Sequence, residues 1–358
     1  MKPRLICCAA MAMLAFAAVS RSQGTDDTIK VDTRLVSVPV IVSDHDGRYV
    51  PNLQQSDFKV LQDGNEQQIA FFGAAEEPVT VAILIDTSQS THAVLGDIKD
   101  SAKSFVKLLQ PKDRAMVVTF DYDVHILSPL TSDQDQLKDA IKHAQIPDRL
   151  VGTMLRDAVY QTVSKSFQGI NGRKAIIVLT DGKDAGSYIR TPDLLYRLEE
   201  SDTMVYTVMF KTVERMPNRG FGRGGVLGGG GFPGGRGGRF PGGGGGRFPG
   251  GGRPGGNFPG GRDRRDPQQR QEREKEQNAE AADLLKDLSD TTAGRFFSSK
   301  DGKLKKTFAE ILEELRFQYR LGFYPPDDEH AGVHQIRVKV DRENIVVRAR
   351  SSYRSQAK

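Results

Sequence analysis

A group of oxygen-bearing side chains follows an apolar run in the first third of the chain. Residues 81–85 are all apolar, and Asp86, Ser88 and Ser90 come directly after them. One carboxylate and two hydroxyl groups thus lie in one tight turn. Hard divalent cations such as Mg²⁺ prefer oxygen ligands in near-octahedral geometry and usually keep some water. The turn supplies part of such a ligand set, so the other donors must come from elsewhere in the chain.

Two later segments offer the missing donors. Thr153 follows Gly152 at the expected start of a helix, and Asp181 follows the apolar run at residues 176–179. In open α/β sheets, ligands bind beyond the carboxyl ends of the strands. We therefore expect these two side chains to lie near the first turn. Together the expected site contains Asp86, Ser88, Ser90, Thr153 and Asp181.

The elements that must position these side chains alternate along the chain. The apolar run at 81–85 does not alternate with polar residues, which predicts a central parallel strand covered on both faces. Further patterns predict strands and helices in alternation, and therefore an α/β fold with a doubly wound, mainly parallel sheet. The strands are expected at 115–120, 175–179 and 204–210, and the helices at 134–143, 154–167 and 192–200.

At the five oxygen donors the chain resembles a known family. Their order and approximate spacing are similar to the metal-ion-dependent adhesion site (MIDAS) of von Willebrand factor type A domains, a module also found as the integrin inserted domain. The resemblance implies one Mg²⁺ or Mn²⁺ per domain, with Ser88, Ser90 and Thr153 as direct ligands. It also implies that Asp86 and Asp181 act mostly through water. A carboxylate from an Asp or Glu of a partner protein would complete the coordination sphere.

These residues also fit other interpretations. Asp and Ser before a helix are ordinary N-caps, but the five donors stand together at the expected strand ends, which favours a metal site. Asp86 could instead be a nucleophile in phosphoryl transfer. That chemistry needs a second acid close by, and the residue two positions later is Ser88. Serine hydrolysis would need a Gly-x-Ser-x-Gly elbow, which is absent, so we predict a protein that is not an enzyme.

The N-terminus has the features of a secretory signal peptide. A positively charged start is followed by a short apolar stretch over residues 5–19, and cleavage is expected by Ser22. An uncleaved membrane anchor is the alternative. Both cysteines, Cys7 and Cys8, lie within this segment, so no disulfide is expected in the mature chain. We expect an exported protein that is periplasmic, envelope-associated or secreted, and not transmembrane if the signal is cleaved.

Composition changes sharply over residues 217–262. Phe-Pro-Gly-Gly recurs at residues 232, 240, 248 and 258, among seven arginines and no acidic residue. Such a segment cannot bury enough apolar surface to fold, which predicts a disordered insertion. Arg-Gly-Gly segments bind single-stranded nucleic acid by charge and stacking, but export argues against that partner. Two predictions remain for this segment: it is a solvated linker, or it contacts an anionic surface.

The two ends of the mature chain have β character. Strand patterns at 35–42, 58–61 and 68–72 are separated by turns, and strand patterns return at 317–326, 335–340 and 344–350. The segment around Tyr319 and the ending from Arg350 to Tyr353 resemble a bacterial secreted subfamily, the acidobacterial-type von Willebrand factor A-related proteins. We expect these N- and C-terminal strands to pair as one small β domain.

The predicted organisation has four parts. They are a signal peptide at 1–22, an N-terminal β region at 29–75, an α/β domain at 79–316 interrupted by the insertion at 217–262, and a C-terminal β region at 317–353. The predicted function is metal-dependent capture of an acidic ligand residue, for protein interaction or adhesion. The alternative is an envelope scaffold with a structural metal that acts through its cationic insertion.

Overall fold

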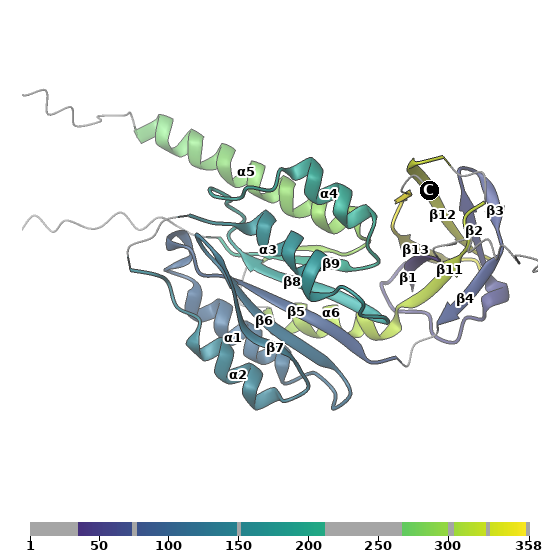
Figure 1. Cartoon of the computed structure of the whole chain (residues 1–358), viewed down its shortest axis with the longest axis horizontal. Helices are drawn as coiled ribbons and strands as arrows, with labels where there is room; N and C mark the ends of the chain where they lie inside the picture. The colour runs from purple at the N-terminus through teal and green to yellow at the C-terminus, as the bar shows by residue number, and fades with distance from the viewer. Residues whose placement is uncertain are drawn as a thin grey trace, which may run out of the picture. The chain divides into compact units, whose positions relative to one another are not determined.

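The structure is a computed structural model that describes residues 35–73, 77–148, 152–211, 267–299, 304–326 and 330–355 (Figure 1). The predicted signal peptide at 1–22 and the glycine-rich insertion at 217–262 both lie outside these ranges. Within the described part, none of the helices is long and apolar enough to cross a membrane.

A six-stranded sheet forms the centre of the α/β part of the chain, in the order β10-β9-β8-β5-β6-β7. Strand β5 is buried along its whole length, as its uninterrupted apolar sequence predicts, and pairs in parallel with β6 and β8. Only β7, at one edge, runs antiparallel. The strands are β5 (Val79–Asp86), β6 (Arg114–Phe120), β7 (Val124–Thr131), β8 (Arg173–Thr180), β9 (Met204–Met209) and β10 (Phe296–Ser298).

Helices cover both faces of this sheet (Figure 1). Side chains of β5 alternate between the two layers: Val81 and Ile83 belong to one core, whereas Ala82 and Leu84 belong to the other. The first core is closed by α1 (Leu95–Val106), α2 (Gln134–His143) and α6 (Leu304–Phe317). The second is closed by α3 (Leu155–Gln161), α4 (Thr191–Glu199) and α5 (Pro267–Thr291). The predicted doubly wound α/β class is confirmed.

The strands from the two ends of the chain pair with each other and form two four-stranded antiparallel sheets. One has the order β13-β1-β11-β4, and the other has the order β14-β12-β2-β3. They bury one apolar core that includes Val38, Val60 and Tyr319. The strands are β1 (Val36–Asp44), β2 (Phe58–Gln62), β3 (Asn65–Gln67), β4 (Ile69–Gly73), β11 (Tyr319–Phe323), β12 (Gly332–Val340), β13 (Ile345–Ala349) and β14 (Ser352–Ser355).

Some elements differ from the sequence-based expectation. The turn at Asp63 and Gly64 joins β2 to the short strand β3, which was not predicted, whereas β4 pairs with β11 in the other sheet. The helix expected over 154–167 is α-helical only through α3, and residues Thr162–Ser166 form a π-helix. The edge strand β7 was not predicted, because its half-exposed residues and Pro129 do not give a clear strand pattern.

Arg350, the first residue of the C-terminal ending, packs onto the α/β part of the chain. Its guanidinium group donates to the carbonyl oxygens of Glu199, the last residue of α4, at 3.3 Å and of Ser201 at 2.9 Å. Burial lowers the pKa of Arg350 to about 10. A cation at the C-terminal end of a helix is favourable because the unpaired carbonyl groups there carry partial negative charge. This ending therefore has a structural role in the fold.

Candidate metal centre

The first turn of the site is folded around the carboxylate of Asp86, the last residue of β5. This side chain is fully buried, and its Oδ1 accepts a hydrogen bond from the backbone N–H of Ser88 at 2.9 Å. Beyond it, the 3₁₀ turn Gln89–Thr91 brings the hydroxyl oxygen of Ser90 to 3.0 Å from that of Ser88. The turn therefore holds both serine hydroxyl groups side by side next to a buried carboxylate.

The second turn follows β8, the neighbour of β5 in the sheet. Thr180 donates from its hydroxyl group to Oδ2 of Asp86 at 2.5 Å and accepts from the backbone N–H of Gly182 at 2.8 Å. Asp181, which lies between Thr180 and Gly182 in the sequence, is only 1% exposed. The ammonium group of Lys183 lies 3.7 Å from Oδ2 of Asp181. Because β5 and β8 are parallel neighbours, the two carboxylates emerge at the same edge of the sheet.

Thr153 reaches this edge from a third segment. It is 5% exposed, and its carbonyl oxygen accepts from the backbone N–H of Ala185 at 3.2 Å, in the loop that follows Asp181. The next residue, Met154, donates its backbone N–H to the carbonyl oxygen of Asp121 at 2.7 Å. The carboxylate of Asp121 in turn accepts from the hydroxyl group of Thr87, at 2.9 Å. The structure thus brings all five sequence-predicted residues, from three loops, to one edge of the sheet.

The electrostatics of this edge suit a cation. Burial raises the pKa of Asp86 to about 7, and the negative charge of Asp181 adds to the rise, whereas hydrogen bonds from Ser88 and Thr180 oppose it. Two buried carboxylates repel each other unless positive charge lies near them. The donors are carboxylate and hydroxyl oxygens, which suit Mg²⁺ or Mn²⁺ better than softer metals. Within the described ranges, no group of three or more His, Cys, Asp or Glu side chains forms a metal site of a different kind.

Three side chains that support the site were not predicted from the sequence. Thr180 ties the two buried turns together, and the pair of Thr87 and Asp121 fastens the first turn to the segment before Thr153. Each of these hydrogen bonds joins residues that are far apart in the sequence, so local patterns could not reveal them. Thr180 alone gave a signal, because it is a polar residue directly after the apolar run at residues 175–179 of β8.

Gly182 is the backbone position on which the second turn depends. Its φ of +83° is unfavourable for other residues, and an added Cβ would lie 3.0 Å from side-chain atoms of both Ala281 and Leu285 in α5. We expect Gly182→Ala to lower the free energy of unfolding by about 2–4 kcal/mol, because it adds both backbone strain and overpacking. Urea denaturation would measure this loss.

The matched control for that substitution is Gly169→Ala. Gly169 also has a positive φ, of +72°, but an added Cβ would meet no atom within 4 Å. We expect backbone strain alone to lower the free energy of unfolding of this variant, by about 1–2 kcal/mol. Equal losses in the two variants would contradict the proposed packing of α5 against the site.

Comparison with known proteins supports this description of the α/β part. The sequence model of the von Willebrand factor type A domain matches residues 80–218. This range contains all five residues of the candidate site and ends before α5. A search of curated proteins gives no match.

A comparison with solved structures also gave matches. BatB from Bacteroides thetaiotaomicron is 17% identical over 66% of this chain and 98% of that chain, with a TM-score of 0.41. An aerotolerance-related membrane protein from Bacteroides fragilis is 18% identical over the same shares, with a TM-score of 0.43. Proximal thread matrix protein 1 from the mussel byssus, whose MIDAS motif is occupied by zinc, is 15% identical over 70% of this chain and 48% of that chain, with a TM-score of 0.44. On the strength of the sequence match, residues 80–218 of this chain are a von Willebrand factor type A domain.

Proposed function

We propose that this protein is an exported, non-enzymatic binding protein that captures an acidic side chain of a partner protein through one bound Mg²⁺ or Mn²⁺. The observation that carries the proposal is the convergence of the three loops at one sheet edge. Two carboxylates and three hydroxyl groups lie there, and nearly all of them are buried. Three neutral hydroxyl ligands do not neutralise a divalent cation that they bind directly, so the cation can attract one more carboxylate.

The residues of the site divide into two roles. Ser88, Ser90 and Thr153 supply hydroxyl oxygens as direct ligands, and their neutrality leaves the positive charge of the metal available to the partner. Asp86 and Asp181 supply the negative charge that holds the cation at the edge, acting through its water molecules. When bound, the metal supplies a Lewis acid at which the partner's carboxylate binds. The fold of the three loops keeps the hydroxyl groups in place.

The experiment that tests the proposal is a calorimetric titration of the chelator-treated protein with Mg²⁺, with Mn²⁺ and Ca²⁺ for comparison. We expect saturable binding at one site. In the double variant Ser88→Ala and Ser90→Ala, affinity should fall by at least about tenfold, because even residues that only support metal ligands contribute that much. Excess acetate, a simple carboxylate, should increase the affinity for the metal, because acetate can occupy the coordination position of the partner's carboxylate.

The matched control is Ser104→Ala. Ser104 is a half-buried serine of α1 whose hydroxyl group donates to the backbone carbonyl oxygen of Asp100, at 2.8 Å. Its replacement should leave metal affinity unchanged. If the wild-type protein binds none of the three cations, with or without acetate, the proposed function is wrong.

A further inference from the structure

Lys183 places a positive charge at the edge of the sheet that carries the candidate metal centre. The chain turns back at Gly182, so that the backbone N–H of Lys183 donates to Oδ1 of Asp181 at 3.2 Å. The ammonium group of the same lysine lies 3.7 Å from the other carboxylate oxygen, Oδ2. Both oxygens of a carboxylate that is only 1% exposed therefore face one lysine.

The two carboxylates of the site differ in the charge of their neighbours. Asp86 accepts from neutral donors, the backbone N–H of Ser88 and the hydroxyl group of Thr180. Asp181 has an ammonium group beside it, on a lysine side chain that is 27% exposed. Because that side chain keeps contact with the solvent, its charge is also accessible to a partner that approaches the sheet edge.

Other charged groups near the three loops are paired with residues outside the five of the site. The guanidinium group of Arg156, in the first turn of α3, lies 3.1 Å from the carboxylate of Asp184. The buried carboxylate of Asp121 lies 3.9 Å from the imidazole of His125.

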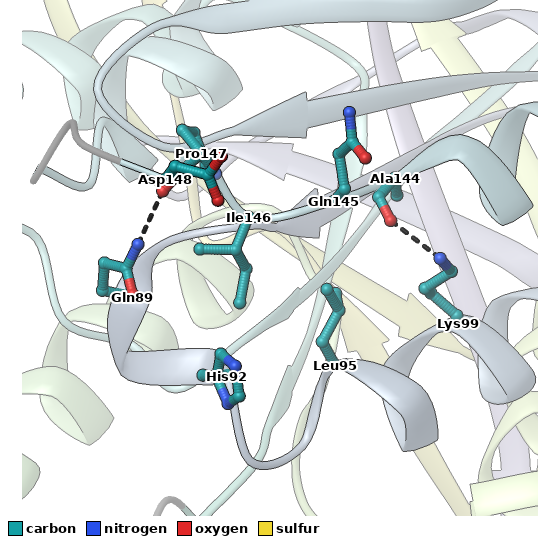
Figure 2. Close-up of a pocket in the computed structure, with 9 residues that line it drawn as sticks. All are labelled: Gln89, His92, Leu95, Lys99, Ala144, Gln145, Ile146, Pro147 and Asp148. Carbon is teal, nitrogen blue, oxygen red and sulfur yellow. Dashed lines mark hydrogen bonds between the residues drawn. The ribbon is translucent and has the colours of Figure 1, made fainter.

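The cation nearest the serine turn along α1 is likewise held by the fold. Lys99 lines a pocket of about 450 Å³ together with Gln89, the residue between the two serines. Its ammonium group donates to the carbonyl oxygen of Ala144 at 2.7 Å (Figure 2). Of Arg156, Lys99 and Lys183, it is thus Lys183 whose acidic neighbour belongs to the candidate metal centre.

We propose that Lys183 couples the two ligands of this centre: its charge weakens metal binding by the free protein and strengthens binding of the partner's carboxylate to the metal-loaded protein. The inference rests on the proposed function and names the residue that makes metal affinity depend on the partner. The charges of Asp86 and Asp181 together balance a divalent cation. The ammonium group then leaves one positive charge in excess, which a single carboxylate neutralises.

Elementary electrostatics gives the direction of both effects. A metal bound next to Asp181 meets a like charge on Lys183, and this repulsion lowers its affinity. An incoming carboxylate is attracted by the metal and by the ammonium group together. Because binding free energies are linked, a carboxylate that binds better to the loaded protein raises the metal affinity by the same factor.

The experiment is a calorimetric Mg²⁺ titration of the chelator-treated, mature full-length protein and of Lys183→Gln, each with and without excess acetate. Without acetate, we expect Lys183→Gln to bind Mg²⁺ about tenfold more tightly than the wild type does, because one positive charge near the metal is removed. The factor by which acetate increases Mg²⁺ affinity should be about threefold smaller in Lys183→Gln than in the wild type. Both differences should shrink at about 0.5 M salt, because ions screen the charge of a partly exposed side chain.

Two further variants separate an effect of charge from an effect on the fold. Lys183→Arg keeps the positive charge and should bind Mg²⁺ within about threefold of the wild type. Lys165→Gln makes the same change of net charge at an exposed lysine of the π-helix at Thr162–Ser166, and it should leave both Mg²⁺ affinity and the acetate effect unchanged.

The outcomes distinguish this inference from the proposed function. If neither the wild type nor any variant binds metal, with or without acetate, the proposed function fails and the inference fails with it. If the wild type binds Mg²⁺ but Lys183→Gln binds it no more tightly, or gains as much from acetate, Lys183 does not couple the two ligands and the proposed function stands. Tighter Mg²⁺ binding in Lys183→Arg equal to that in Lys183→Gln would also overturn the inference, because the charge would then not be the cause.

Discussion

Replacing Asp86 by asparagine is expected to abolish Mg²⁺ binding and, at the same time, to stabilise the metal-free protein. Asparagine has the same shape and retains an oxygen that can accept from the backbone N–H of Ser88. It removes, however, a fully buried negative charge that faces Asp181. A buried charge without a partner of opposite sign is costly, so its removal should raise the free energy of unfolding of the chelated protein.

The expected gain is about 1–2 kcal/mol at about pH 8, in the range seen when a functional residue that is unfavourable for folding is replaced. Urea denaturation in the presence of chelator would measure it, and calorimetry would measure the loss of Mg²⁺ binding. Asp100→Asn serves as the control, because the side chain of Asp100 is 81% exposed and should matter to neither quantity. A metal-free Asp86→Asn protein that is less stable than the wild type would contradict the assignment of this residue to the metal.

Replacing Glu314 by alanine is expected to cause the largest loss of stability among the substitutions considered. Glu314 lies in α6 and is only 1% exposed. Its carboxylate accepts from the hydroxyl group of Tyr206 in β9 at 2.9 Å and pairs with Arg348 of β13 and, at 3.4 Å, with Arg295. It thereby joins the central sheet to the sheet that contains β1 and β13.

Alanine would leave two arginines without this carboxylate and a buried tyrosine hydroxyl group without its acceptor. Breaking a buried ion pair by removing one partner costs about 3–5 kcal/mol, and we expect a loss of that size in urea denaturation. Glu313→Ala is the matched control: this neighbouring glutamate is exposed, so its removal should change stability by no more than about 0.5 kcal/mol. Similar effects of the two substitutions would show that the Glu314 ion pairs do not hold the two sheets together.

Repeating local patterns made much of the fold predictable. The apolar strands β5 and β8 and the amphipathic helix α2 were predicted close to their observed bounds. A strand or helix that is buried on one face or on both has a characteristic spacing of apolar residues, which is visible in the sequence. Strand β7 and the pairing of β4 with β11 were not predicted, because short or half-exposed strands give a weak pattern and their partners are distant in the sequence.

The candidate site likewise has some features that were predictable from the sequence and others that were not. The position of its five residues at one sheet edge was predictable because each follows an apolar strand or starts a helix, and parallel strands must end at one edge. The hydrogen bond from Thr180 to Asp86, by contrast, joins residues that are 94 positions apart.

Periodicity and strand order thus predict the class of the fold, the positions of its buried strands and which oxygen-bearing side chains lie at one sheet edge. The folded chain, in contrast, reveals how those side chains are held, where the pocket lined by Gln89 lies, and that Glu314 is a buried ion-pair centre. Those features depend on contacts between segments that the chain brings together from far apart. A local sequence pattern carries no information about such contacts.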